Sequence, residues 1–286
     1  MKYLVGLFIF FLVSLTHALE VSDDQNDRII LKKPAHRIIS LSPDITEILF
    51  DIGAGSQVVG VVSGSDYPDA AKHIPRIGSY LGIDLEKILV LHPDLIVTWD
   101  HVFLRQTRAF KQFSIPVYTV MSKNLEDIAR TMKNLSILTG QEKHGFQQAQ
   151  QWMRTLATIK KKYHRQKTVS VFYQLGSYSL MTINQDSWIN QVITFCGGHN
   201  VFANTKKIAN EVSLEAVIYA NPQVIINDGR AADWQKRWQA FPMMKAVKYG
   251  NLYRISPDLI ERAGPRLLQG TAQVCDFLAL ASDKLS

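Results

Sequence analysis

The chain has 286 residues, 47% of them hydrophobic and 20% charged, and carries a formal net charge of +7. Its length exceeds one average domain, and its apolar content suffices for one core or two, so the chain can form two lobes. The basic residues are dispersed, and their densest cluster, KKKYH at 160–164, falls in a helical pattern typical of a solvated helix face. This pattern argues against a nucleic-acid partner.

The first 18 residues, MKYLVGLFIFFLVSLTHA, have the features of a secretory signal peptide. Lys2 precedes an apolar run of roughly a dozen residues, and we expect cleavage after Ala18. A membrane anchor is the alternative, but this run is shorter than the roughly 20 residues that span a bilayer, and no other stretch could span one. Cleavage removes one lysine and leaves a net charge of +6. The mature protein is therefore expected to be exported and soluble.

Only two cysteines occur, Cys196 and Cys275, and neither lies near the cleavage site. A lipid anchor on an N-terminal cysteine is therefore not expected. An even pair in an exported protein predicts one disulfide, with two free buried thiols as the alternative. A disulfide points to an oxidising compartment such as a bacterial periplasm.

After a polar leader at 20–36, the segment RIISLSPDITEILFDIG at 37–53 begins as a strand and continues as a helix. Pro43 suits an early helical position, and the glycines at 53 and 55 end the helix. The run QVVGVVS at 57–63 predicts a buried strand because it is almost continuously apolar and β-branched. DYP at 66–68 predicts a turn.

Two stretches, DLEKILVLHPDLIV at 84–97 and SLEAVIYANPQVII at 213–226, repeat one pattern about 130 residues apart. In each, Leu-Glu opens an apolar-periodic run, a proline follows seven residues after the Glu, and a β-branched run closes the pattern. The polar residue that opens each copy is a predicted helix cap, and the proline ends the helix before a strand at 95–99 or 224–227. Each copy is thus a helix-to-strand unit of an alternating α/β lobe.

Residues between the two copies predict a helical connection. One helix ends at Gly140 and a longer one, at 141–165, has one apolar face. No stretch rich in Gly, Ser or Pro occurs between 120 and 168, so a stiff helix rather than a flexible tether is expected to join the lobes.

The second lobe is predicted to contain a strand at 169–174, helices at about 187–196 and 234–247, a strand at 252–255 and a last helix after Pro265. The expected organisation is a signal peptide at 1–18, an N-terminal α/β lobe at 19–120, an inter-lobe helical segment at 121–166 and a C-terminal α/β lobe at 167–286.

Catalytic and metal-binding patterns are missing. The sequence has no nucleophile elbow, P-loop or dinucleotide fingerprint, and its histidines show no HxH or HExxH spacing. A metal site would have to draw on five histidines that fall in different predicted elements, where surface or capping roles are the alternative. These are His36, His73, His92, His101 and His199.

Aromatic residues follow several predicted strands or lie in the loops after them: Tyr67, Tyr80, Trp99 and Tyr173. In open α/β sheets, ligands gather beyond the carboxyl ends of the strands. Flat rings with a polar edge suit a large, partly apolar ligand. Ordinary core or rim positions are the alternative for each ring.

At this point the stretches at 37–68 and 77–99 are recognisable as motifs. The chain resembles the periplasmic cobalamin-binding proteins of ABC importers, within a wider class of two-lobed substrate-binding proteins for cobalamin, haem and iron siderophores whose lobes are linked by one rigid helix. Further motifs are INQVITFCGGHNVF at 189–202 and SPDLIERAGPRLL at 256–268. The resemblance covers about 36 to 282.

The resemblance gives the repeated unit a function. In such proteins a surface Glu on each lobe docks against arginines of two identical membrane subunits, and those positions fall on Glu86 and Glu215. An exposed carboxylate on each lobe can form charge-assisted pairs with arginine, which fix orientation as well as affinity. The alternative is a carboxylate favoured in the first turn of a helix by the helix dipole.

For the ligand, the resemblance implies contacts from Tyr67, Tyr80, Trp99 and an acidic residue at Asp258. Asp258 could instead form a capping box with the glutamate three residues on.

The sequence also departs from the cobalamin pattern in its second lobe. Ala209 stands where those relatives have a Trp, and Leu259 and Ile260 replace two bulky aromatics. Whether Tyr178 or Trp188 compensates for the missing rings is left open.

The sequence therefore predicts an α/β protein of two lobes joined by one long rigid helix, with a ligand cleft between them. We expect a monomeric, non-lipidated periplasmic protein that binds cobalamin, delivers it to the membrane subunits of an ABC importer, and has no catalytic activity, cofactor or bound metal of its own. Haem or a ferric siderophore is the alternative ligand, with Arg262 and Arg266 pairing with its carboxylates. A zinc- or manganese-binding protein and an enzyme that uses the same cleft are the alternatives from other classes.

Overall fold

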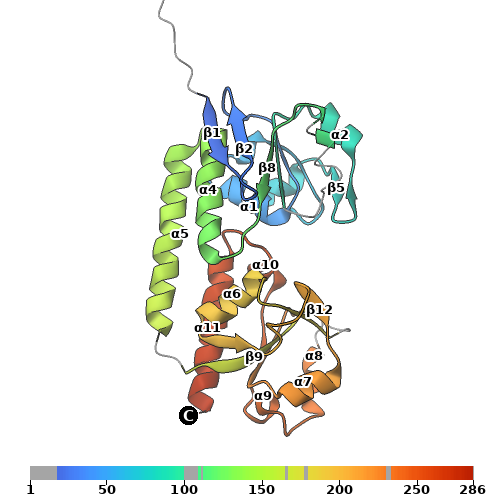
Figure 1. The fold of residues 1–286 in the computed structure, drawn as a ribbon, viewed down its shortest axis with the longest axis vertical. Coiled ribbons are helices and arrows are strands. Elements are labelled where there is room, and N and C mark those ends of the chain that lie inside the picture. The colour runs from blue at the N-terminus through green and yellow to red at the C-terminus, as the bar shows by residue number, and fades with distance from the viewer. Residues whose placement is uncertain are drawn as a thin grey trace, which may run out of the picture.

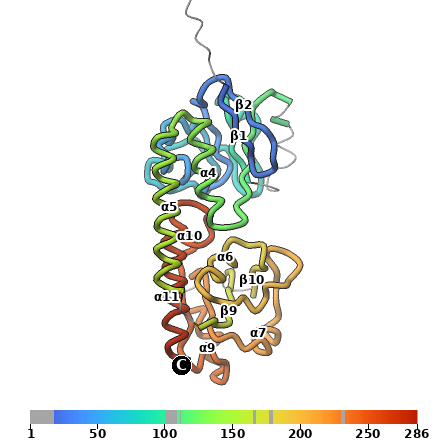
Figure 2. Tube along the Cα trace, turned by 60° about the vertical axis from the view of Figure 1, so that its left-hand side comes forward, coloured from blue at the N-terminus to red at the C-terminus, as the bar shows by residue number. Residues whose placement is uncertain are grey.

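The computed structural model describes residues 18–99, 109–110, 112–164, 167–176, 180–229 and 233–285. They form two α/β lobes stacked along the long axis of the molecule, with α5 (Glu142–Tyr163) and α11 (Leu267–Lys284) side by side along one flank (Figures 1 and 2). The predicted fold class is confirmed. All but the last residue of the predicted signal peptide falls outside the described residues, so the signal peptide stays a prediction. None of the described helices is long and apolar enough to cross a bilayer.

The first lobe is built on a four-stranded parallel sheet in the order β4-β3-β7-β8. Its elements are β1 (Leu19–Ser22), β2 (Arg28–Leu31), β3 (Ile38–Ser40), α1 (Pro43–Asp51), η1 (Gly55–Gln57), β4 (Val58–Val61), η2 (Asp69–His73), β5 (Gly78–Ser79), β6 (Gly82–Ile83), α2 (Leu85–Val90), β7 (Leu95–Trp99), β8 (Val117–Val120) and α4 (Leu125–Thr139).

The second lobe repeats this plan with a four-stranded parallel sheet in the order β11-β9-β13-β14. Its elements are β9 (Val169–Gln174), β10 (Met181–Ile183), α6 (Trp188–Phe195), β11 (Gly198–Asn200), β12 (Ala209–Glu211), α7 (Leu214–Ala220), β13 (Val224–Asn227), α8 (Trp234–Gln239), α9 (Lys245–Lys248), β14 (Leu252–Arg254), α10 (Pro257–Ile260) and α11.

The two predicted helix-to-strand units occupy equivalent places in the two sheets. Strand β7 lies between β3 and β8, and β13 lies between β9 and β14. The side chain of Asp84 accepts a hydrogen bond from the Lys87 amide at the start of α2, and Ser213 accepts one from the Ala216 amide at the start of α7. Both predicted caps are therefore confirmed, and the sequence repeat is a repeat of structure.

Apolar side chains cover both faces of each sheet, as the continuous apolar runs of the strands require. Neighbouring residues alternate between faces: Ile38 and Leu95 belong to one core and Ile39 and Ile96 to another. The first of these cores is continuous through α1, α4, α5, α6 and α11, so it passes from one lobe into the other. The lobes thus share apolar contacts along the flank formed by the long helices.

The connecting segment is helical, as predicted. Helix α4 starts with a capping box between Asn124 and Asp127 and ends at Gly140, whose φ of +70° suits a residue without a Cβ. Helix α5 then runs from the side of the first lobe to the level of β9 in the second (Figure 1). The domain boundaries at 120 and 166 and the stiffness of this connection stay predictions.

Three features differ from expectation. The leader at 20–36 contains an antiparallel hairpin, β1–β2, which joins the first lobe through a hydrogen bond from the Asp24 amide to the Thr119 carbonyl. The helix predicted at 234–247 is broken into α8 and α9, since Pro242 lacks the amide hydrogen that a continuous helix needs. The antiparallel pair β10–β12 was also not predicted, because its strands have only three residues each.

The predicted disulfide is confirmed. Cys196, at the end of α6, is bonded to Cys275 in α11, and both are buried. The bond closes a segment with a sequence separation of 79 and joins two elements of the second lobe.

Replacing both cysteines with alanine is expected to lower the free energy of unfolding by roughly 2 to 4 kcal/mol, because the unfolded chain loses a constraint over a long loop. Urea denaturation of the wild type and of the double variant would measure this difference. A reducing agent should destabilise the wild type and leave the double variant unchanged. Equal stability of the two proteins under oxidising conditions would contradict the prediction.

Candidate functional site

A pocket of about 280 Å³ lies where the two lobes meet. The first lobe contributes residues that follow β3 and β4, the last residue of β7 and Tyr80 in the turn between β5 and β6. The second lobe contributes the start of α6 and the end of α10. The lining residues are Leu41, Ser42, Pro43, Asp44, Val62, Ser63, Tyr80, Trp99, Trp188 and Glu261. The pocket thus lies beyond the carboxyl ends of parallel strands, where ligands gather in open α/β sheets.

Three aromatic rings line this pocket from both lobes. Trp99, at the end of β7, and Trp188, at the start of α6, meet edge to face with ring centroids 4.9 Å apart. The Trp188 indole N–H donates to the Ile260 carbonyl at 2.9 Å, which fixes that ring on the second lobe. Tyr80 stands at the rim with 83% of its surface exposed. Of the predicted ligand residues, Tyr80 and Trp99 are therefore brought together.

Asp44 lines the pocket and is only 4% exposed. The Trp99 indole N–H donates to its Oδ2 at 2.6 Å, and the Ser42 hydroxyl donates to its Oδ1. Burial raises the pKa of this carboxyl, although both hydrogen bonds oppose the shift. Asp44 was not among the predicted ligand residues, although it stands at the helix start that follows a predicted strand.

A cluster of charges joins the lobes beside the pocket. Glu47 in α1, whose side chain is 1% exposed, accepts two hydrogen bonds from Arg266, at 3.0 and 2.7 Å, and one from Arg262 at 2.9 Å. Arg262 also pairs with Asp66 at 2.8 Å and with Asp258 at 3.0 Å. The hydrogen bond to Glu47 raises the pKa of Arg266 further above its usual range. We call these five residues the inter-lobe charge cluster.

Of the other two predicted ligand residues, Asp258 belongs to this cluster and Tyr67 adjoins it, and neither lines the pocket. The guanidinium of Arg266 lies 4.1 Å from the ring centroid of Tyr67, which lines a neighbouring hollow of about 380 Å³ with Glu47, Phe50 and Pro265. Asp258 lies in the first turn of α10, where Ser256 is the N-cap and Arg262 is the partner, so Asp258 does not form the capping box. Tyr67 and Asp258 are thus linked to each other through two arginines.

The pairing of these arginines bears on the alternative ligands. Arg262 and Arg266 were predicted to bind the carboxylates of haem or a siderophore, but in this structure carboxylates of the protein itself bind both. A ligand carboxylate would have to displace Glu47 or share its partners.

The second-lobe residues that differ from the cobalamin pattern lie in different environments. Ala209 is exposed on β12, Ile260 is buried, and Leu259 is half-buried. Trp188 supplies a ring to the pocket from the second lobe. Tyr178 lies outside the described residues. Tyr173, one of the aromatics singled out in the sequence, is a core residue, 1% exposed.

The two predicted docking glutamates are exposed on the first turns of α2 and α7. In each helix the residue two positions after the glutamate, Ile88 or Val217, is buried against its own sheet, so each glutamate faces outward. Hydrogen bonds from its own amide and from Ser213 lower the pKa of Glu215 and keep it charged. Nothing in the structure tests the docking role itself.

Within the described residues, no three His, Cys, Asp or Glu side chains come together as a metal site. His101, one of the five candidate ligands, lies outside them.

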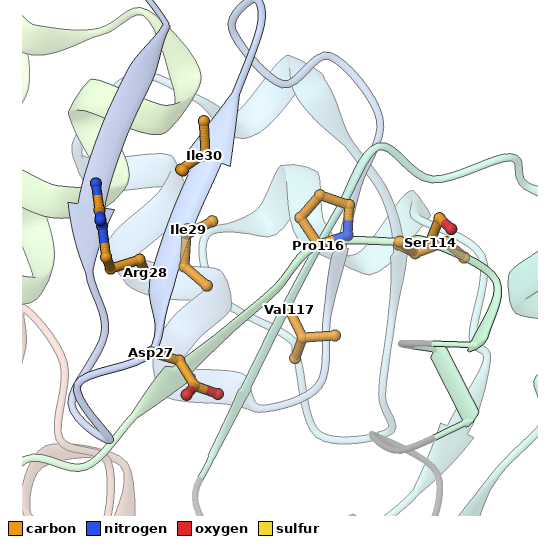
Figure 3. Close-up of a pocket in the computed structure, with 8 residues that line it drawn as sticks. Asp27, Arg28, Ile29, Ile30, Ser114, Pro116 and Val117 are labelled. Carbon is orange, nitrogen blue, oxygen red and sulfur yellow. The ribbon is translucent and has the colours of Figure 1, made fainter.

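A larger hollow of about 430 Å³ lies in the first lobe between β2 and the start of β8 (Figure 3). Asp27, Arg28 and Ile30 line one side of it and residues 114–117 line the other. None of the predicted ligand residues lines this hollow, which opens at the edge of a sheet. We therefore place the candidate site in the inter-lobe pocket, despite its smaller volume.

A model of the periplasmic binding protein family matches residues 38–259. The chain belongs to this family. The vitamin B12-binding protein of Vibrio parahaemolyticus is 33% identical over 252 residues, which cover 85% of this chain and 90% of that protein. The vitamin B12-binding protein of Salmonella paratyphi A is 35% identical over 252 residues, covering 86% and 91%.

Solved structures of periplasmic binding proteins agree with this assignment. The periplasmic vitamin B12-binding protein BtuF of Vibrio cholerae matches with a TM-score of 0.82 at 33% identity, covering 87% of this chain and 98% of that one. The haem-binding protein BhuT, in complex with two haems, matches with a TM-score of 0.78 at 19% identity and covers 89% and 100%, a likeness of fold alone. The resemblance found in the sequence is confirmed.

Glu47→Ala is expected to lower the free energy of unfolding by about 3 kcal/mol, because it leaves two arginines partly buried without their shared partner. This figure is at the low end for a buried pair, since the arginine side chains stay 15% and 16% exposed. Chemical denaturation would measure the change. The matched control is Asp69→Asn, which removes a carboxylate that pairs with Lys72 on the surface and should cause no measurable change. Equal effects of the two substitutions would contradict the prediction.

Proposed function

We propose that this protein captures cobalamin in the cleft between its lobes and delivers it to an ABC importer from the periplasm. The observation that carries the proposal is the inter-lobe pocket, in which Tyr80 and Trp99 of the first lobe face Trp188 of the second. Vitamin B12-binding proteins at 33–35% identity over most of the chain support the choice of ligand.

The three rings suit the flat, partly apolar face of a corrin. Aromatic side chains bury a large area and keep well-defined geometry, so they contribute affinity with little loss of side-chain freedom. The pocket, at about 280 Å³, is smaller than the roughly 300–1,000 Å³ of pockets that bury drug-sized ligands. A corrinoid is larger than a drug-sized ligand and therefore does not fit within this pocket alone. It would extend past the rim residue Tyr80 and towards Tyr67 and Asp258.

In this proposal Trp188 takes the place of the ring that Ala209 lacks. It enters the pocket from the second lobe, at the start of α6 instead of β12. Its indole N–H is already bonded to the Ile260 carbonyl, so the ring is held in position before the ligand arrives.

The proposed delivery of the ligand to the importer uses the two copies of the helix-to-strand unit. Glu86 and Glu215 are exposed on equivalent helices of the two lobes, and a membrane partner made of two identical subunits needs two equivalent contacts. Arginines on that partner would form charge-assisted pairs with both carboxylates. The protein itself would perform no chemistry on its ligand and would act as a monomer, exported by its signal peptide and not lipidated.

Isothermal titration of the mature protein is expected to give a nanomolar dissociation constant for cyanocobalamin, about −12 kcal/mol, and no comparable binding of haemin. Trp99→Ala and Trp188→Ala should each weaken binding tenfold or more, because each removes a large apolar contact of roughly 1.5–3 kcal/mol. Tyr219→Ala, an exposed aromatic on α7 far from the pocket, serves as the control and should bind normally. Tighter binding of haemin than of cyanocobalamin would sink the assignment of the ligand.

Glu86→Arg and Glu215→Arg are each expected to weaken docking to the importer, and the double variant should abolish stimulation of ATP hydrolysis in reconstituted vesicles. Affinity for cyanocobalamin should not change. Glu126→Arg is a matched control, because Glu126 is also an exposed acid in the first turn of a helix but lies outside the repeat. If the control is as defective as the other two, general surface charge explains the effect and the docking role is wrong.

A further inference from the structure

The inter-lobe pocket is acidic although the chain as a whole is basic. Its ten lining residues include two acids, Asp44 and Glu261, and no lysine, arginine or histidine. The formal charge of the whole chain is +7. The composition of the pocket is therefore opposite in sign to that of the molecule.

Asp44 differs from the other buried acid of α1. Glu47, one turn further along the helix, is neutralised by Arg262 and Arg266. The hydrogen-bond partners of the Asp44 side chain are neutral groups, the Ser42 hydroxyl and the Trp99 indole. No lysine or arginine among the residues that the structure describes forms an ion pair with Asp44. A carboxylate buried without a cation lowers stability, and the place of Asp44 in the first turn of α1 offsets only part of this cost.

The donors around the Asp44 carboxylate are all neutral. The Ser42 hydroxyl and the Trp99 indole donate from side chains, and the backbone amides of Asp44 and Ile45 also favour the charged form. The residue lines the pocket, and its main chain is held against the second lobe. A Cβ added to Gly264 would lie 3.3 Å from the Asp44 carbonyl oxygen. The Asp44 backbone therefore lies against Gly264 of the second lobe, while its carboxylate is bonded to Ser42 and Trp99.

We propose that Asp44 determines which ligands this pocket accepts: its carboxylate takes a hydrogen bond from a primary carboxamide N–H at the edge of the ligand and excludes a ligand that places a carboxylate there. This inference rests on the proposed function, since cobalamin carries such amides around its ring. Haem carries carboxylates instead. A charge-assisted hydrogen bond favours the amide, and repulsion between two carboxylates in a poorly hydrated pocket disfavours the acid.

The first test changes the ligand and needs no variant. Cyanocobalamin would be partly hydrolysed at its peripheral amides, and the separated monocarboxylic acids and their methyl esters would be titrated into the wild-type protein. At one position the acid is expected to bind roughly a hundredfold more weakly than the amide, with the ester, which is neutral but cannot donate, in between. Equal affinities of acid and ester at every position would overturn the proposal.

The second test changes the residue. Asp44→Asn keeps an acceptor for the Trp99 indole and removes the charge, so the ratio of acid to amide dissociation constants should fall to about threefold or less. Asp69→Asn, which removes an exposed carboxylate outside the pocket, should leave the ratio at its wild-type value. If Asp44 only positions Trp99, the substitution weakens the amide and the acid alike and the ratio stays, which refutes the role in selection.

The two proposals fail in different ways. Failure of the wild type to bind cyanocobalamin overturns the proposed function, and this inference with it. Tight binding of cyanocobalamin together with an unchanged ratio in Asp44→Asn overturns only the role of Asp44.

Discussion

The position of the two lobes depends on one buried carboxylate. Glu47 comes from α1 of the first lobe, and both of its arginine partners follow α10 in the second, so the interaction closes the junction from opposite sides. Through Arg262 and Arg266 it also holds Asp66, Asp258 and the ring of Tyr67. Ion pairs of this kind contribute little net stability compared with apolar packing, but they tolerate few alternative geometries. The cluster therefore adds directional contacts between the lobes to the apolar core that they share along α5 and α11.

The fold was predictable where local signals agreed with each other. The strands at 95–99, 169–174 and 224–227 have the predicted bounds, because each is a continuous apolar run closed off by a proline, a charged segment or a turn. Asp84 and Ser213 act as caps for the same reason: a polar side chain stands directly before an apolar-periodic run. The hairpin β1–β2 was missed because its stability comes from contacts with β8 and α4, which are about a hundred residues away in sequence.

The site was predictable only in part, since its geometry depends on contacts between lobes. Trp99 ends β7 of the first sheet and Tyr80 lies in a loop of the same lobe, and their place near the carboxyl ends of the strands was expected from the sequence. The contact between Trp99 and Trp188 could not, because it requires the relative placement of two sheets whose sequences are independent. The same holds for Glu47: in the sequence it reads as an ordinary acid near the start of a helix, and only the folded chain brings Arg262 and Arg266 to it.

Glu47 and Asp44 have different roles: Glu47 joins the two lobes, and we assign Asp44 to the selection of the ligand. Both are buried acids on α1, less than one turn apart, and an acid buried in a protein is normally paired with a cation. The arginines of the second lobe satisfy this rule for Glu47 and leave Asp44 with neutral donors only. At the junction of the lobes, Glu47 is paired with two arginines, whereas Asp44 lines the pocket and has neutral hydrogen-bond partners. Because two acids three residues apart in one helix receive such different partners, we assign the Asp44 carboxylate to ligand selection, in which a neutral donor fits its position and an anion does not.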